Sequence, residues 1–300
     1  MIGYLFITSY CIFSAFSFVF ISLGNQYDKS VIAFSSFLIA TSFFNILNFY
    51  HLRATYRKLG AHIKDVLGMN FVSASGWLAS LHALNYISPA TLLCTNMGVT
   101  SIFSFLITTK ISEYRKNYSI IIAILCILVG LGTITYQEYQ TQKNMQSFYY
   151  ILTGVMLAII DGIAGAYVGC FAERLTKNEF SVLEILSSRF FLLIIVSCVL
   201  LLRLQDKLSL TSITIADCQY LAFVSFILII VPLFFYVKSI AHLGALSTGI
   251  MLSLVPIFAY FMQLYTSKYH FNSIVFCVLI FCSAAIISMN LLHDLSRKDL

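Results

Sequence analysis

Hydrophobic residues gather along this chain in runs of about 20, which short polar breaks separate. A helix needs about 20 apolar residues to cross the ~30 Å hydrocarbon core of a bilayer. Because the charges are pushed toward the ends of these runs, helices are favoured over barrel strands. We predict an all-α integral membrane protein with ten spans, at residues 2–23, 30–51, 66–86, 89–109, 118–137, 148–172, 180–202, 218–239, 242–264 and 271–292.

The outline of this pattern occurs twice. Residues Trp77–Thr135 hold two tightly joined apolar segments, a polar turn at Glu113 and a third apolar segment. A stretch of the same outline begins at Leu233, 156 positions after Trp77. Few residues are identical between the two, so the match rests on the spacing of segments and breaks. Repeated hydropathy in two halves is typical of transporters.

Composition excludes a soluble protein. The chain has 300 residues, of which 60% are hydrophobic and only 10% are charged, and its mean hydropathy is +0.91. Soluble domains carry about 25% charged residues. The net charge of +6 is spread over short loops, so it indicates no nucleic-acid partner.

The eight cysteines all lie in or at the edge of apolar segments, and no CxxC or Cys/His ligand spacing occurs. Buried, inert thiols are therefore expected, and we predict no metal and no cofactor. The N-terminus has no basic region and no small-residue cleavage site, so we expect the first segment to remain as a span.

Basic residues predict the orientation. With a cytoplasmic N-terminus, twelve of the 18 Lys and Arg fall on the inside, and five fall outside: Lys29, Lys143, Arg203, Lys207 and Lys268. This asymmetry favours cytoplasmic N- and C-termini. Five spans per half is an odd number, so the second half enters the membrane upside down relative to the first. We therefore predict two inverted five-helix repeats, at residues 1–143 and 144–300.

Three short motifs add to this layout. They are an acidic-basic turn after the fourth span, a glycine-bearing run in the fifth and a proline in the ninth: Ser112-Glu113-Tyr114-Arg115-Lys116, Val129-Gly130-Leu131-Gly132 and Pro256. In layout and motifs nearly the whole chain resembles the drug/metabolite transporter superfamily, in its ten-helix EamA-like form.

The chain also departs from the family pattern. Thr100 stands where the first half would carry the proline, Lys268-Tyr269-His270 replaces the second acidic turn, and the final helix lacks the usual glycine. In the family these motifs shape helices and turns and bind no substrate. The resemblance therefore implies the fold and transport, and says little about the transported molecule.

Asp161, in the middle of the sixth span, is the sharpest chemical signal. A carboxylate at mid-membrane costs at least about 2.5 kcal/mol on insertion scales, so it needs a partner or water. It either binds a cation or proton in a central cavity or forms a structural pair, with Arg189 at similar depth in the seventh span as the natural partner. Alternatively, Arg189 faces the cavity and holds a substrate carboxylate. The spacing of Gly162, Gly165 and Gly169 indicates helix packing.

Other polar residues are candidates for the site. Trp77 is the only Trp and lies far from either interface, so it stacks on a substrate or fills space. His82 corresponds to Lys238 in the second half, and both are candidate gate residues or snorkel to the interface. Asn96 and Tyr236 need hydrogen-bond partners, which a substrate or a neighbouring helix supplies equally well.

Further candidates rank lower. Glu184 lies closer to the membrane surface and about 140° around the helix from Arg189, so the two do not share a face. Prolines 232 and 256 are expected to bend their helices, as hinges or as fixed kinks. Additional lining candidates are Tyr167, Tyr10, Asn45 and Asn48, whereas Thr95 ranks with Asn96 and Tyr236 among the best neutral polar candidates.

The prediction is a secondary transporter, without enzyme activity, that moves a small organic metabolite by alternating access in a bacterial cytoplasmic (inner) membrane. Amino-acid-like substrates rank first by the resemblance, and a choline-like quaternary ammonium is the alternative, with aromatic residues near Asp161. A membrane-embedded enzyme needs clustered catalytic residues, but the six His are dispersed. Proton coupling through Asp161 or Glu184 and facilitated exchange are both open, as are a monomer and a homodimer.

Overall fold

The computed structural model describes residues 2–23, 28–108, 118–142, 147–203, 215–266 and 269–298, and all regular secondary structure within these ranges is helical. The expectation of an all-α membrane protein is confirmed at this level. The turn at Glu113, Lys268 of the second turn and the predicted repeat boundary at 143/144 lie outside the described residues.

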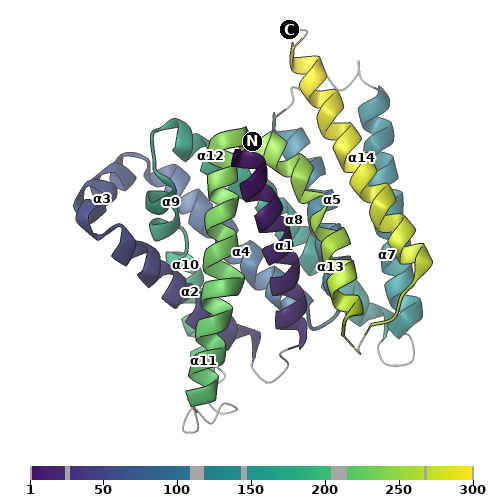
Figure 1. The fold of residues 1–300 in the computed structure, drawn as a ribbon, viewed down its shortest axis with the longest axis horizontal. Coiled ribbons are helices and arrows are strands. Elements are labelled where there is room, and N and C mark those ends of the chain that lie inside the picture. Colours follow the sequence, from purple (N-terminus) through teal and green to yellow (C-terminus); the bar gives the residue numbers. More distant parts are fainter. Residues whose placement is uncertain are drawn as a thin grey trace.

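The first half contains the long helices α1, α2, α4, α5 and α7 (Figure 1): Ile2–Leu23, Lys29–Leu47, Ile63–Ala83, Pro89–Thr108 and Tyr118–Gln142. The second half contains α8 to α14: Phe148–Lys177, Val182–Ser188, Phe191–Arg203, Ile215–Phe223, Val231–Leu252, Val255–Leu264 and Ser273–Lys298. Helices of this kind satisfy every backbone hydrogen bond internally, as a lipid environment requires.

Eight helical stretches of the described chain are long and apolar enough to cross a membrane. They are α1, α2, α5, α7, α8, α9 with α10, α11 with α12 up to Gly244, and the rest of α12 with α13. Helix α4 packs along α8, and α14, whose apolar part Ser273–Met289 is shorter, packs along α7.

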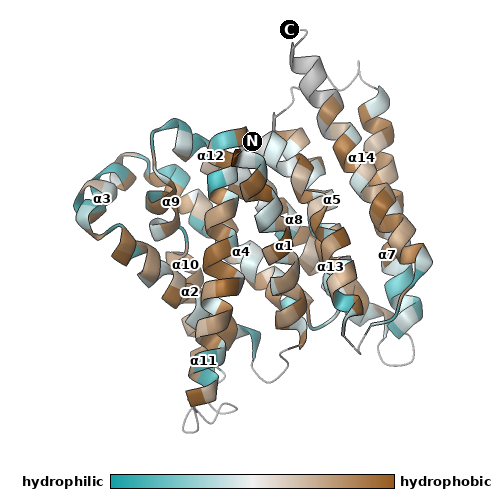
Figure 2. Cartoon of the chain, in the orientation of Figure 1, coloured by the Kyte–Doolittle hydropathy of each residue, from teal (hydrophilic) through white to brown (hydrophobic). Residues whose placement is uncertain are grey.

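The second predicted span, 30–51, is wrong at its end. Helix α2 stops at Leu47, and the chain continues through a 3-10 turn, Phe49–His51, into the short helix α3, Leu52–Ala61. Only Thr55 and Leu59 of α3 are buried. Basic residues make α3 strongly amphipathic, so it leaves the apolar layer and lies at one end of the molecule, where Figure 2 colours it largely hydrophilic.

Three other predicted spans are not regular α-helices throughout. The seventh is interrupted at Arg189 and Phe190, between α9 and α10. The eighth contains a π-helical segment, Val224–Ile230, directly before Pro232. The ninth is interrupted at residues 253 and 254, before Pro256 begins α13, and Gly244 with a φ of 78° makes the turn between the eighth and ninth. Prolines lack the N–H that a continuous helix needs, which fits the last two interruptions.

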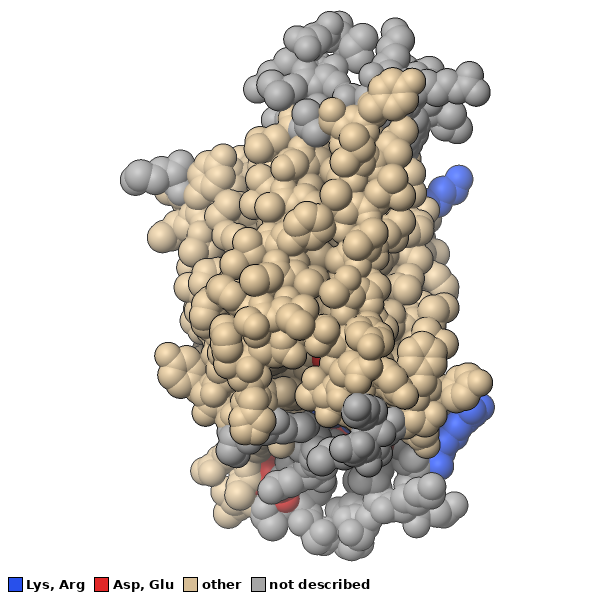
Figure 3. Space-filling model, turned by 90° about the vertical axis from the view of Figure 1, so that its right-hand side faces the viewer, with Lys and Arg blue, Asp and Glu red and all other residues tan. Residues whose placement is uncertain are grey.

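The two halves are interleaved. Helix α8 packs against α4 and α5, and α1 packs against α12 and α13, while α2 lies against α10. Glycines permit the closest approaches: a Cβ on Gly162 would fall 2.8 Å from the backbone oxygen of Asn96. The outer faces are apolar, and the side of the molecule formed by α7 and α14 shows almost no charge between its two ends (Figure 3).

Candidate functional site

A central cavity lies between helices of both halves. Its walls come from α1, α4 and α5 of the first half and from α8, the α9–α10 break and α12 of the second. Its volume is about 90 Å³. Ligand pockets typically have volumes of about 300–1,000 Å³, so in this conformation the cavity is narrow and must widen to hold a whole organic molecule.

Asp161 lines this cavity close to the middle of the 30-residue α8. Its carboxylate accepts a hydrogen bond from the side-chain amide of Asn96 on α5. One turn further along α5, the Thr100 hydroxyl donates to the Gly162 carbonyl at 2.9 Å. The sequence predicted Asp161 and Asn96 as separate candidates, and the structure joins them into one contact across α5 and α8.

Arg189 lines the same cavity from the break in the seventh segment. Its side chain is only 4% exposed. Nε donates to the Ser73 hydroxyl at 2.9 Å, and the guanidinium carbon lies 5.1 Å from the centre of the Phe190 ring. Nη1 is buried and has no hydrogen-bond partner among the described residues.

The backbone on both sides of this break is held by asparagine side chains. The Asn70 amide donates to the Ser188 carbonyl at 2.7 Å and accepts from the Leu192 N–H at 3.3 Å. Asn45 donates to the Ser187 carbonyl at 2.9 Å. Side chains thus satisfy polar groups that the interrupted helix leaves free, which is the condition for irregular backbone at membrane depth.

The predicted ion pair between Asp161 and Arg189 is absent, which excludes that alternative for this conformation. Ion pairs among the described residues join Lys58 to Glu184, Asp65 to Arg174 and Glu173 to Lys177. The physical reason lies in the contacts already made: Asn96 holds Asp161, while Ser73 holds Arg189. Both charges therefore face the cavity without pairing.

Aromatic rings complete the lining. Trp77 faces the cavity and packs between Phe18, at 6.1 Å with nearly parallel rings, and Phe37, at 4.9 Å in an edge contact. Tyr10 and Tyr236 lie with ring centres 5.2 Å apart, and both line the cavity. Of the substrate-binding residues predicted from sequence, the structure gathers Trp77, Asn96, Asp161, Arg189 and Tyr236 in one place.

Other predicted residues lie elsewhere. Tyr167 is 40% exposed on α8 and is not among the cavity residues, because the cavity face of α8 is the one that carries Asp161 and Gly165. His82 is half-buried near the end of α4, and Lys238 is half-buried on α12; neither lines the cavity. Thr95 faces a second, apolar cavity between α5, α7 and α8.

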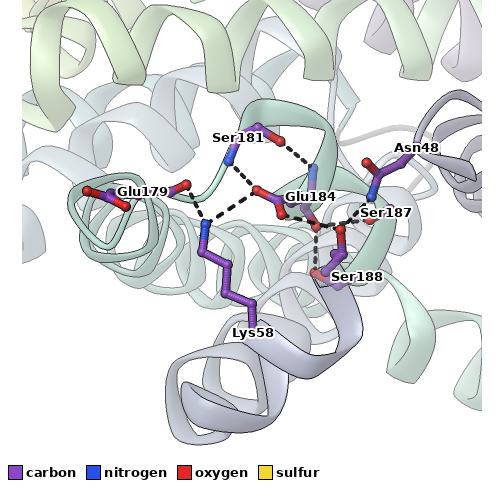
Figure 4. Close-up of polar contacts among 8 residues, drawn as sticks. Asn48, Lys58, Glu179, Ser181, Glu184, Ser187 and Ser188 are labelled. Carbon is purple, nitrogen blue, oxygen red and sulfur yellow. Dashed lines mark hydrogen bonds and ion pairs between the residues drawn. The ribbon is translucent and has the colours of Figure 1, made fainter. Parts of the chain in front are cut away.

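Glu184, predicted as a gating or coupling residue, belongs to a polar cluster that joins α3 to α9 (Figure 4). It forms a capping box with Ser181, and Lys58 approaches its carboxylate to 3.7 Å. The Thr55 hydroxyl donates to Glu184 at 3.3 Å and accepts from Asn48 at 2.9 Å. These contacts indicate a structural role for Glu184 in this conformation, outside the cavity.

Sequence reasoning missed Glu138, a second buried carboxylate. It is 8% exposed on α7 and accepts hydrogen bonds from the Ser88 backbone N–H at 2.8 Å and from the Thr91 hydroxyl at 2.6 Å. Gln263 on α13 accepts from the Ala90 N–H at 3.3 Å. The signal was present, since Glu138 directly follows the predicted fifth span, whose helix extends five residues further, to Gln142.

The chain is similar to known proteins in sequence and in fold. Residues 152–290 match the EamA-like transporter family. The EamA-like family is part of the drug/metabolite transporter superfamily, so the resemblance inferred from the sequence is confirmed. EamA-like proteins are membrane transporters of small molecules, and the apolar helices of this chain are those of a multi-pass integral membrane protein.

A solved structure is similar in fold over nearly the whole chain. A crystal structure described only as that of a protein superposes with a TM-score of 0.61, over 95% of this chain and 96% of its own, at 10% identity. At this identity the likeness concerns the fold alone. A search of curated proteins found no match.

Proposed function

We propose that this protein is a secondary transporter that carries a small organic metabolite through the central cavity by alternating access. The observation that carries the proposal is a cavity at the middle of the apolar helices whose polar walls come from both halves of the chain. An alternating carrier needs such a site, because movement of one half against the other then changes the side from which the site is reached.

The proposed architecture is ten spans in two inverted repeats, residues 1–143 and 144–300, with α4 and α14 as the two further spans. Helix pairings support it. In the two repeats α1 corresponds to α8, α4 to α12, and α5 to α13. A repeat therefore requires that the contact of α4 with α8 has a counterpart between α12 and α1, and that the contact of α5 with α8 has one between α13 and α1. All four contacts occur.

We propose cytoplasmic N- and C-termini in a bacterial inner membrane. Figure 1 supports a shared side for the two termini, because α1 begins and α14 ends toward the top of the molecule as drawn. Helix α3 carries Arg53, Arg57 and Lys58, and the excess of basic residues marks the cytoplasmic side. A monomer and a homodimer are both compatible with this proposal.

The amino-acid-like substrate remains the first candidate, and Asp161 and Arg189 supply the opposite charges that such a molecule needs. The choline-like alternative has one observation in its favour, since Tyr10, Trp77 and Tyr236 share the cavity with Asp161. Buried Arg189 counts against it. Proton coupling through Asp161 and uncoupled exchange both fit, and gating by His82, Glu184 and Lys238 stays a prediction.

The test is flux across sealed proteoliposomes that contain the purified protein. A thermal-shift screen against metabolites first selects compounds that raise the unfolding temperature. We expect at least one of them to enter the vesicles with saturable kinetics and to show counterflow, in which preloaded unlabelled compound accelerates uptake of labelled compound. Binding without saturable flux would contradict a transport function.

A further inference from the structure

Helix α3 is attached to the rest of the protein along one face. That face buries Thr55 and Leu59, and Lys58 beside them approaches the Glu184 carboxylate of α9 to 3.7 Å. The Thr55 hydroxyl also donates to Glu184, at 3.3 Å. Figure 1 shows α3 at the left margin of the molecule, on the side away from α7 and α14. The opposite face of α3 is therefore open to the surroundings of the protein.

A hydrogen bond shows which edge of α3 faces the membrane. The Tyr56 hydroxyl donates to Oδ1 of Asn45 at 3.1 Å, and Asn45 lies two residues before α2 ends at Leu47. Tyr56 thus points back along a helix that is long and apolar enough to cross a membrane. The edge of α3 that carries Tyr56 therefore faces the lipid, and α3 lies along the membrane surface.

Arg53 and Arg57 lie next to this edge. Successive residues of an α-helix are about 100° apart, so Arg53 is about 60° and Arg57 about 100° around the helix from Tyr56, both turned away from the buried Leu59. Both arginines are exposed, and no ion pair among the described residues includes either of them. Like charges four residues apart repel each other, so an anion that both guanidinium groups reach stabilises this face.

Exposed aromatic side chains lead into α3. Phe49 is 67% exposed and Tyr50 is 92% exposed, in the turn that joins α2 to α3. Tyrosine is enriched at the level of the lipid headgroups. Amphipathic helices with basic polar faces lie in that plane and bind more strongly to anionic lipids. The surroundings that suit Arg53 and Arg57 are therefore lipid headgroups.

We propose that Arg53 and Arg57 form a binding site for the phosphate of an anionic phospholipid, in the leaflet along which α3 lies. The guanidinium forks match phosphate oxygens. A headgroup with a net negative charge complements the two unpaired positive charges, whereas a zwitterionic headgroup does not. The site lies outside the central cavity, so it does not depend on the transported molecule. Because α3 is bonded to α9 through Glu184, a bound lipid is expected to stabilise the fold.

The test measures lipid binding to the purified protein in detergent by native mass spectrometry. The probes are dioleoylphosphatidylglycerol and dioleoylphosphatidylcholine, which have the same acyl chains. A basic residue near an anionic surface contributes about fivefold to binding, so we expect wild type to prefer the anionic lipid by about tenfold or more. The double variant Arg53→Gln/Arg57→Gln is expected to lose most of this preference. Arg53→Lys/Arg57→Lys keeps both charges and should retain most of it at low salt.

Arg203→Gln is the matched control. Arg203 is also exposed, and no ion pair among the described residues includes it, but it lies at the end of α10 rather than on α3. Its lipid preference should equal that of wild type. Thermal unfolding gives a second measurement, in which the anionic lipid should raise the unfolding temperature of wild type more than that of the double Gln variant. Size-exclusion profiles show that each variant folds, and the single Gln variants carry the test if the double variant does not.

Three results would overturn the site: no preference for the anionic lipid in wild type, a preference that survives the double Gln substitution, or an equal loss in Arg203→Gln. Equal stabilisation of wild type by inorganic phosphate at the same concentration would also overturn it, because the arginines would then bind a free anion and recognise no lipid. Flux in proteoliposomes is measured separately, so failure of the lipid site leaves the transport proposal standing.

Discussion

Glu138 caps the first turn of α5 from a neighbouring helix: its carboxylate accepts hydrogen bonds from the backbone N–H and the hydroxyl of Ser88, at 2.8 and 2.7 Å. Carboxylates stabilise helix N-termini because of the helix dipole and the unpaired N–H groups there. We expect Glu138→Ala to lower stability by about 3 kcal/mol, since buried hydrogen bonds to a charged group contribute about 1.5–3 kcal/mol each. Thermal unfolding in detergent measures the change.

Glu138→Gln should cost less, because one acceptor oxygen remains. Thr141→Ala on the same helix is the control, since the exposed Thr141 hydroxyl bonds only the carbonyl of Gln137 one turn away. Equal unfolding temperatures for Glu138→Ala and Thr141→Ala would show that the cap contributes nothing.

Asn70→Leu tests how the break in the seventh segment is maintained. The substitution keeps the side-chain volume nearly constant but leaves the Ser188 carbonyl and the Leu192 N–H without their side-chain partner. Each unsatisfied buried group costs about 1–3 kcal/mol, so we expect a loss of several degrees in unfolding temperature. Asn45→Leu removes a single bond to that break and should cost less. The reverse order of the two would contradict this account.

Gly162→Ala should push α5 away from α8. The added Cβ would lie 2.7 Å from Cβ of Val99 and 2.8 Å from the backbone oxygen of Asn96, neither of which is the end of a flexible side chain. Overpacking typically costs about 1–3 kcal/mol. Gly132→Ala is the matched control, because nothing lies within 4 Å of its Cβ position. A smaller effect for Gly162 than for Gly132 in thermal unfolding would refute the close crossing.

Asp161→Asn is expected to abolish uptake, or its pH dependence, and to leave the protein folded. The reason is that the amide keeps the size of the side chain but removes the charge that faces the cavity. Uptake into proteoliposomes measured at a series of pH values around neutrality provides the measurement. Unchanged transport across this range would remove Asp161 from the mechanism.

Hydropathy predicted where most helices lie, because a run of about 20 apolar residues has one favourable arrangement in a membrane. It did not predict α3, because Phe49 and Tyr50 prolong the apolar run past Asn48, where α2 ends. Nor did it predict the break at Arg189, which depends on Asn45 and Asn70 from other helices. Contacts of that kind are set by packing between segments distant in sequence, so no local pattern contains them.

The candidate site was predictable only in part, because some of its residues stand out in the sequence and others acquire a role only through packing. Asp161, Arg189 and Trp77 stand out from an apolar background on their own. Ser73, Gly76 and Thr100 do not, because small hydroxyl residues and glycines are common in membrane helices. Their roles appear only once α4, α5 and α8 are packed together.

The opposite charges in the cavity bear on how the membrane voltage acts on this protein. With Asp161 ionised, the pair Asp161 and Arg189 adds no net charge to the empty cavity. A potential of 100 mV contributes about 2.3 kcal/mol for each elementary charge that crosses the whole field. In the proposed alternating-access cycle, return of the empty carrier therefore moves no net charge from these two residues through the field, and a substrate without net charge adds none. Without a co-transported ion, such a cycle is electrically silent and runs on the concentration difference alone.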